Sequence, residues 1–261
     1  MHYFRVTIAY KGTHYFGWQA QSKDTLKEEY PTIEGTILKA LKKMSNYQHC
    51  TVSAASRTDG GVHAQGQLAK ISLSINISAD HLLLGLNSSL PLDIRILECA
   101  SSTKNFQPNV SSVSKEYHYY FTASKTDNVA ISEISLRLST HDNGPIDLAL
   151  LRTACQLFVG QHDFYNFSVH DLNNASSVRQ ISYCDILQAN FSPLVDEVYY
   201  LKIIGDGFLK YMIRYVMGAL IELAKGRITL EDIAFYLQHQ QDDKLSAKAK
   251  AKGLHLIKIN E

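Results

Sequence analysis

Apolar and polar residues alternate over the first ten positions of the chain, which predicts a β-strand with one buried face. The residues on that face are Phe4, Val6, Ile8 and Tyr10. Similar alternation further along predicts strands over residues 51–56, 67–77, 91–96, 115–122, 181–189, 198–204 and 254–259. A polar loop over residues 57–66 separates the second of these strands from the third.

Apolar residues spaced three and four apart predict helices between these strands. Thr32 is a good N-cap for the first helix, which carries a stripe from Ile33 to Met44. Further helices are expected over residues 78–86, over 147–160 with Gly160 as the terminating glycine, over 209–225, and from Thr229 onward.

A polar stretch over residues 101–114 interrupts this pattern and predicts a boundary between two halves. We place the amino-terminal half at residues 1–104 and the carboxyl-terminal half at residues 105–261. Each half offers strands and helices of its own, so the expected fold class is α+β with two sheet-bearing halves.

Composition narrows the class of protein further. Apolar residues make up 45% of the chain and charged residues 20%, which excludes a disordered or collagen-like chain. The formal net charge is +1, so any surface for nucleic acid must be a local patch. The start of the chain does not resemble a signal peptide, no apolar stretch is long enough to span a membrane, and the four cysteines form no C-x-x-C pair. These features predict a soluble cytoplasmic protein with reduced thiols.

The densest cluster of reactive residue types lies in the predicted loop, at residues 55–64 with the sequence ASRTDGGVHA. Two glycines allow close approach of a ligand, and Asp59 before them suits a nucleophile, a general base or a metal ligand. The alternative is an ordinary Asp-Gly turn in which Arg57 merely pairs with Asp59. Residue types alone leave both interpretations open.

The loop resembles the R-T-D-x-G-V-H-A signature of the tRNA pseudouridine synthase A (TruA) family. Six further segments resemble that family in the same order, so the resemblance covers almost the whole chain. They are YKGTHYFGWQ (10–19), the helix at 32–41, LNSSLPLDI (86–94), KEYHY (115–119), GQHDFYNF (160–167) and GFLKYMIRYVMG (207–218).

The resemblance implies the pseudouridine synthase fold, with a central catalytic cleft between the two halves. It implies isomerisation of uridine to pseudouridine at positions 38–40 in the anticodon stem-loop of tRNA, without a cofactor or a metal. It also implies a homodimer in which one tRNA contacts both subunits, which would widen the basic surface that one near-neutral chain offers.

The resemblance assigns catalytic roles to three residues. Asp59 is the nucleophile, although the sequence leaves open which atom it attacks. Arg214 would keep that carboxylate ionised, and Tyr117 would stack on the uracil, with its hydroxyl available for proton transfer at C5. From residue types alone, Arg214 could instead lay its stem along the core with its head in water, and Tyr117 could be a core residue.

Substrate binding falls on Arg57, Thr58 and His63, together with Tyr117. Arg57 would hold the target nucleotide, or alternatively make a structural hydrogen bond within the loop. His63 is expected to brace the loop through a side-chain hydrogen bond. No His, Cys or Asp spacing resembles a zinc site, so no metal is expected.

The chain departs from the family pattern in a few places. Ser56 and Gly60 stand where Gly and Ala are usual, and both are small. Gln107-Pro108-Asn109 replaces a usual His-Ala-Arg, which removes two groups suited to RNA binding or loop order. Residues 248–253 replace a small, often Pro-containing segment with a lysine-rich one, which would touch phosphate or form a solvated face.

Three rival functions remain. A tRNA-binding or tRNA-folding protein with weak or lost catalysis would fit the departure at residues 107–109. A hydrolase using Asp59 on a small substrate explains the loop but none of the other six segments. A metal-dependent nuclease needs several carboxylates, whereas the loop supplies one.

Overall fold

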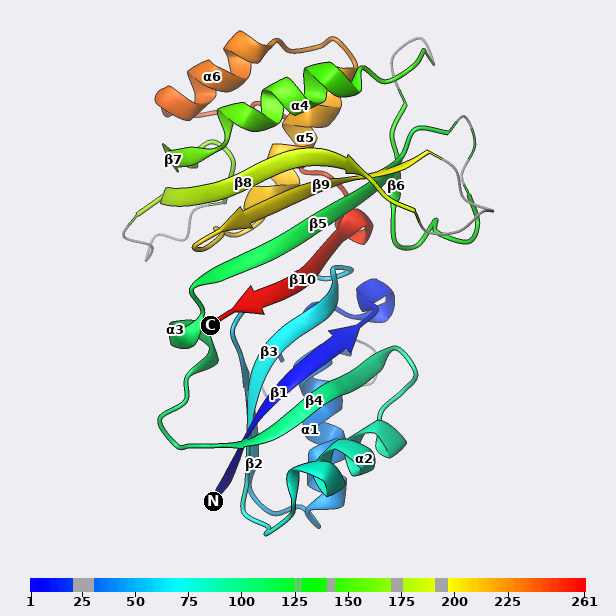
Figure 1. Ribbon diagram of the computed structural model, residues 1–261, viewed down its shortest axis with the longest axis vertical. Helices are drawn as coiled ribbons and strands as arrows, with labels where there is room; N and C mark the ends of the chain where they lie inside the picture. Colours follow the sequence, from blue (N-terminus) through cyan, green and yellow to red (C-terminus); the bar gives the residue numbers. More distant parts are fainter. Residues whose placement is uncertain (21–30, 125, 127, 140–143, 170–175, 191–196) are drawn as a thin grey trace. The chain divides into compact units, whose positions relative to one another are not determined.

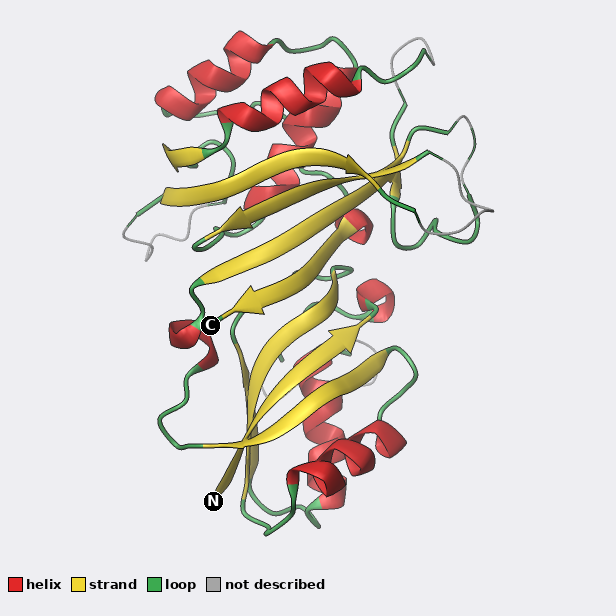
Figure 2. Ribbon diagram, viewed as in Figure 1, coloured by secondary structure: helices red, strands yellow, loops and turns green. Residues whose placement is uncertain are grey.

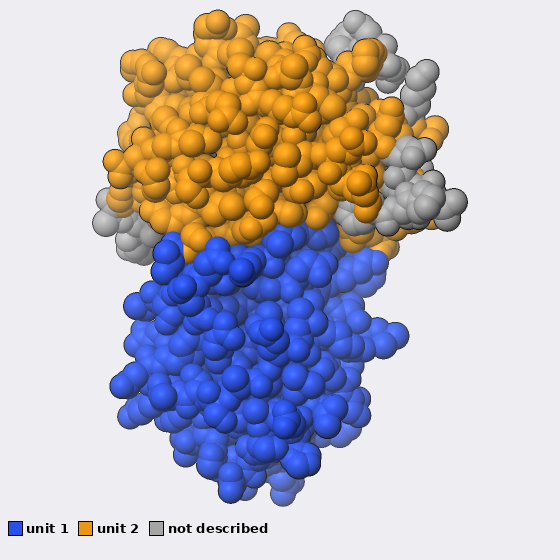
Figure 3. All heavy atoms as spheres, in the orientation of Figure 1, with its two compact units in different colours: residues 1–113, 255–261 blue, residues 114–254 orange. Residues whose placement is uncertain are grey.

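The computed structural model describes residues 1–20, 31–124, 126, 128–139, 144–169, 176–190 and 197–261. The chain forms two compact units, drawn in blue and orange in Figure 3. Unit 1 comprises residues 1–113 together with 255–261, and unit 2 comprises residues 114–254. The end of the chain therefore returns to the unit that contains its beginning. Each unit combines strands with helices, as Figure 2 shows by colour, so the fold class is α+β.

Unit 1 is built on a mainly antiparallel sheet (Figure 1). Its central strand β1 (His2–Tyr10) pairs with β4 (Ile94–Ser102) on one side and β3 (His63–Leu73) on the other. Strand β2 (Cys50–Ala54) is antiparallel to β3, and β10 (Leu254–Asn260) runs parallel to β3 with His255 opposite His63. The predicted inner face of β1 is buried along its whole length.

Three helices accompany this sheet: α1 (Ile33–Met44), α2 (Ala79–Ser89) and the short α3 (Pro108–Ser111). The side chains of Thr32 and Ser78 cap α1 and α2 by accepting hydrogen bonds from backbone amides of the first turn. Helix α1 packs against β2 and α2 against β4, and the two helices contact each other.

In unit 2, four neighbouring strands pair in antiparallel fashion, in the order β5 (Ser114–Thr122), β9 (Val198–Gly205), β8 (Val178–Gln188), β7 (Gly160–Asp163). The two-residue β6 (Leu136–Arg137) runs parallel to β5. Helix α4 (Leu148–Leu157) packs on β8 and contacts α5 (Met212–Ala224) and α6 (Leu230–Gln238). Asp147 caps α4, and Thr229 with Asp232 forms a capping box at α6, as the sequence predicts.

Several predicted boundaries are wrong, and the strand expected at 91–96 spans 94–102. The strand expected at 67–77 spans 63–73, because His63 and Ala64 pair with neighbouring strands and Leu73 is the last paired residue. Helix α4 ends at Leu157, and Gly160 opens β7 instead of terminating the helix. Helix α5 begins at Met212 instead of 209, because Tyr211 has a left-handed φ of 65° that is incompatible with a right-handed helix.

None of the helices within the described parts of the chain is long and apolar enough to cross a membrane.

Candidate active site

The loop that carries Asp59 turns sharply between β2 and β3. The backbone amide of Val62 donates to the carbonyl of Asp59 at 3.2 Å, which closes a four-residue turn. Gly61 has a φ of 79° in this turn, a conformation that favours glycine. Gly60 has an ordinary φ, and a Cβ there would meet its nearest neighbours at 3.5 Å. The departure from the usual alanine at position 60 is therefore structurally neutral.

Gln67 clamps the start of this loop. Its side chain is fully buried, donating to the carbonyl of Ser56 at 2.6 Å and accepting from the Ser56 amide at 3.2 Å. Because these bonds use the backbone of residue 56, they do not depend on which small side chain stands there. Sequence reasoning missed Gln67, although a polar residue on the otherwise apolar face of its strand is a usable signal.

Thr58 ties the loop to the opening segment of the chain. The side chain is buried, and its hydroxyl shares a 2.8 Å hydrogen bond with that of Tyr10. Its carbonyl accepts a 3.0 Å hydrogen bond from the amide of Trp18, which is itself buried. The observed contacts of Thr58 thus fix the backbone immediately before Asp59.

His63 holds the far end of the loop. Its Nδ1 accepts a 3.2 Å hydrogen bond from the amide of Gly12, so Nδ1 carries no proton in this arrangement and the ring proton is on Nε2. The imidazole is buried and stacks on that of His255 from β10, with ring centroids 4.5 Å apart. The hydrogen bond from Gly12 to His63 is the bracing side-chain hydrogen bond that the sequence predicts.

Two glycines of the opening segment allow it to lie directly on the loop. A Cβ on Gly12 would overlap the carbonyl oxygen of Val62. Gly17 has a φ of 97°, and a Cβ there would lie 2.8 Å from the carbonyl oxygen of Thr58. Close backbone contact at both positions explains the two glycines of the YKGTHYFGWQ segment.

Asp59 is half-buried at the centre of this framework, while Arg57 is exposed. Within the described residues Arg57 makes no ion pair, so the alternative in which it only neutralises Asp59 is not supported. The loop therefore presents a carboxylate on a backbone that is fixed before and after it, as a nucleophile requires.

In unit 2, Tyr117 projects from β5 into a largely buried position with 6% of its surface exposed. The ring of Phe208 meets it edge-on, with centroids 5.2 Å apart and an angle of 78° between the planes. Tyr119, two residues further on, is fully buried and donates to the carbonyl of Lys250 at 2.7 Å. Tyr119 is thus a core residue, and Phe208 is a neighbour of Tyr117 that sequence reasoning did not single out.

Arg214 lies in the first turn of α5 and is 9% exposed. Its Nε donates to the carbonyl of Ala249 at 2.8 Å, while the Ala249 amide donates to the Arg214 carbonyl at 2.9 Å. The guanidinium carbon lies 5.3 Å from the ring centroid of Tyr211. The guanidinium is therefore fixed in place, in contrast to the alternative in which it extends freely into water.

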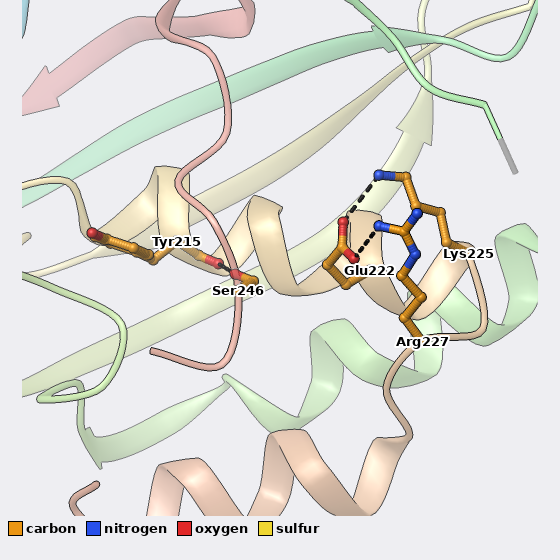
Figure 4. Close-up of polar contacts among 5 residues, drawn as sticks. All are labelled: Tyr215, Glu222, Lys225, Arg227 and Ser246. Atoms are coloured by element: carbon orange, nitrogen blue, oxygen red, sulfur yellow. Dashed lines mark hydrogen bonds and ion pairs between the residues drawn. The ribbon is translucent and has the colours of Figure 1, made fainter. Parts of the chain in front are cut away.

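The segment that contains Ser246 crosses close to α5 near Tyr215 (Figure 4). Ser246 donates to the carbonyl of Tyr215 at 3.4 Å, and a Cβ on Gly218 would overlap the carbonyl oxygen of Ala247. Gly218 therefore permits the close approach of this segment to the helix. At the other end of α5, Glu222 pairs with Lys225 and Arg227, each at 3.0 Å.

The segment at residues 160–167 has a structural role in unit 2. Phe164 and Phe167 are buried. The side-chain Nδ2 of Asn166 donates to the carbonyls of Tyr236 and His239 at 2.6 and 2.7 Å. These bonds fix the end of α6, so this segment has a structural role although it carries none of the predicted catalytic residues.

The structure thus gathers Arg57, Thr58 and Asp59 in one loop of unit 1, with His63 at the start of the strand that follows it. In unit 2, Tyr117 and Arg214 flank the turn from Phe208 to Tyr211. The meeting of Asp59 with Tyr117 and Arg214 stays a prediction. Across the residues that the structure describes, no group of three or more His, Cys, Asp or Glu is placed to hold a metal ion.

Comparison with known proteins supports the sequence resemblance. A family model described as tRNA pseudouridine synthase matches residues 6–108 and 154–260. A Desulfotalea psychrophila protein named tRNA pseudouridine synthase A 2 is 70% identical, with 99% of this chain and 98% of that protein covered. The tRNA pseudouridine synthase A of Thermodesulfovibrio yellowstonii is 33% identical, with 98% of each chain covered.

Among solved structures, a Cbf5–Nop10–Gar1 complex aligns with a TM-score of 0.37 at 9% identity, over 97% of this chain and 48% of that one, which is too distant to carry weight. The family match covers most of the chain, and the relatives align over nearly all of it. The chain therefore belongs to the tRNA pseudouridine synthase A family of pseudouridine-forming isomerases.

Proposed function

We propose that this protein converts uridine to pseudouridine at positions 38–40 in the anticodon stem-loop of tRNA, with Asp59 as the nucleophile and no cofactor. The observation that carries the proposal is the presentation of Asp59. Its carboxylate is half-buried on a turn whose flanking residues, Thr58 and His63, are buried and hydrogen-bonded to the opening segment.

The chemistry explains why a fixed carboxylate suits this reaction. The C1′–N1 bond of uridine breaks, the uracil turns and a C5–C1′ bond forms. C5 loses its proton and N1 gains one, so the product is an isomer of uridine. The base must be held while it is detached from its usual position, and a carboxylate can attack and later leave. The target uridine must also leave the base stack, and Tyr117, supported edge-on by Phe208, offers an aromatic face for it.

Arg214 and Arg57 have complementary roles in this proposal. The Arg214 guanidinium, oriented by Ala249 and Tyr211, offsets the cost of keeping Asp59 ionised in a closed site. The exposed Arg57 holds the target nucleotide. We also expect a cytoplasmic homodimer, since a chain with a net charge of +1 gains basic surface for tRNA when two copies combine.

Tritium release from tRNA transcripts labelled with [5-³H]uridine tests the substrate directly. We expect release from a transcript with uridines at positions 38–40, and loss of release when cytidine replaces those uridines. Release that persists after the replacement would contradict the proposed sites, and its position could then be mapped.

A second candidate, a tRNA-binding protein with weak catalysis, is favoured by the segment at residues 107–109. Pro108 is buried at the first position of α3, and the Gln107 carbonyl accepts hydrogen bonds from the amides of Val110 and Ser111 at 3.0 and 2.9 Å. The segment is therefore ordered without the usual His and Arg, but it lacks their positive charge. Tight tRNA binding without tritium release would support this candidate.

A further inference from the structure

Three cations surround the ring of Tyr211 at the start of α5. The Nζ of Lys248 lies 3.7 Å from the ring centroid, the Cζ of Arg214 5.3 Å, and the Nζ of Lys210 5.4 Å. Each distance is within the range of a cation–π contact. One aromatic ring thus lies close to three positive charges, and one of them, Arg214, takes part in the proposed mechanism.

The backbone of Tyr211 is held in an unusual conformation to place this ring. Its φ of 65° lies in the left-handed region, which a residue with a Cβ rarely adopts. The amide of Tyr215 donates to the Tyr211 carbonyl at 3.1 Å, so α5 begins immediately after this residue.

The lysines of the cluster are not neutralised by neighbouring carboxylates. Lys210 and Lys248 are exposed, and neither forms an ion pair with any residue that the structure describes. The opposite end of α5 is different, because Glu222 pairs there with both Lys225 and Arg227 (Figure 4). Gathering like charges is unfavourable unless an anion binds among them, so the end of α5 with Lys210 and Lys248 is the one suited to an anion.

The backbone that carries Lys248 is fixed close to Arg214. Ala249, the next residue, exchanges hydrogen bonds with both the Nε and the carbonyl of Arg214. Beyond it, the Lys250 carbonyl accepts from Tyr119, and the Lys252 ammonium donates to the carbonyl of Ser132 at 2.6 Å. Lys252 is therefore occupied within the protein, whereas Lys248 presents its charge at the surface.

We propose that Lys248 and Lys210, gathered on Tyr211 beside Arg214, bind a backbone phosphate of the RNA next to the target uridine. This inference rests on the proposed function, since it places an RNA strand at Arg214. The chain departs from the family pattern in charge at both segments, since residues 107–109 lack the usual His and Arg while residues 248–253 are rich in lysine. A phosphate contact contributes affinity and register without reading the base.

The test compares native protein with Lys248→Ala and Lys248→Arg, using binding of an anticodon stem-loop RNA over a range of salt concentrations together with steady-state tritium release. Loss of one phosphate contact should lower the slope of log Kd against log salt by about 1. We expect Lys248→Ala to raise Kd and KM roughly three- to tenfold with kcat unchanged, and Lys248→Arg to restore both. Lys43→Ala, an exposed lysine on α1, serves as the matched control and should behave as native protein.

A salt slope for Lys248→Ala equal to that of native protein would overturn the inference, and would show that Lys248 only packs on Tyr211. An equally lowered slope of log Kd against log salt in Lys248→Arg would also overturn the inference, because that variant retains the charge. The result is separable from the proposed function: native protein that binds RNA but releases no tritium contradicts the proposed activity, while the salt slopes still report on the phosphate contact.

Discussion

The Asp59 loop of unit 1 and the start of α5 in unit 2 hold their polar side chains in opposite ways. Around Asp59, the surrounding residues are buried and bonded to backbone groups, as Gln67 is to Ser56 and His63 is to Gly12. Around Arg214, the carbonyl of Ala249 and the ring of Tyr211 help to position the guanidinium, and neighbouring lysines are exposed.

The difference indicates a division of tasks between the two regions. Backbone hydrogen bonds in a buried setting fix geometry closely, as a reacting carboxylate requires. Ring faces tolerate some movement of a cation while keeping its charge in place, which suits contact with a flexible RNA backbone. Breaking the first arrangement should therefore destroy activity, whereas weakening the second should mainly reduce activity or affinity.

The largest effect is expected from Gly12→Ala, which forces the opening segment away from the carbonyl of Val62. Because the Val62 carbonyl oxygen belongs to the backbone, the loop itself must shift. We expect the unfolding free energy to fall by roughly 1–3 kcal/mol and kcat to fall about a hundredfold. Gly60→Ala is the matched control, since its added Cβ has room and should leave both quantities unchanged. Urea unfolding and single-turnover tritium release measure the two effects. Equal behaviour of the two variants would contradict the fixed-loop description.

A smaller effect is expected from Arg214→Lys, which keeps the charge but removes the planar group that bonds Ala249 and lies near Tyr211. We expect kcat to fall about ten- to a hundredfold, with less change in tRNA affinity. Arg227→Lys, at the far end of the same helix, should retain the native rate. A native kcat in Arg214→Lys would show that charge alone suffices there.

The smallest effect is expected from Glu222→Gln at the paired end of α5. Burial alone would raise the pKa of Glu222, but its hydrogen bonds and charge interactions with Lys225 and Arg227 outweigh burial and lower that pKa. A carboxyl whose folded pKa is lowered stabilises the fold above the ordinary glutamate pKa of about 4.3, and this stabilisation is lost as the pH falls through the folded pKa.

Urea unfolding should therefore show Glu222→Gln to be less stable than native protein by about 0.5 kcal/mol near pH 7. The difference should shrink as the pH falls below about 4. Tritium release should be unaffected, in contrast to Arg214→Lys. A difference in stability that grows on acidification would contradict the direction assigned to the pKa.

Local signals in the sequence predicted much of this fold. The cap at Thr32, the capping box at Thr229 and the alternation in β1 each depend on residues close together in the chain, and the structure confirms all three. The pairing of β10 with β3 depends on residues almost two hundred positions apart, so no local pattern could reveal it.

The candidate site shows the same limit. Asp59 and its loop were recognisable from one short segment, but the bracing by Gln67 and His255 arises from contacts between strands. The cluster on Tyr211 was hidden for a different reason. The helical spacing of residues 209–225 predicted an unbroken helix, whereas Tyr211 has a left-handed φ, the helix begins three residues later, and the Nζ of Lys248 lies over the Tyr211 ring.

The central claim is that the Asp59 carboxylate performs the isomerisation, and the most direct test is tritium release from labelled tRNA by native protein, Asp59→Asn and Asp242→Asn. Asp242 is an exposed aspartate outside the site and provides the matched control. We predict that Asp59→Asn still binds tRNA but releases tritium roughly 10⁴-fold more slowly or not at all, while Asp242→Asn retains the native rate. Release by Asp59→Asn within about tenfold of native protein would contradict the account.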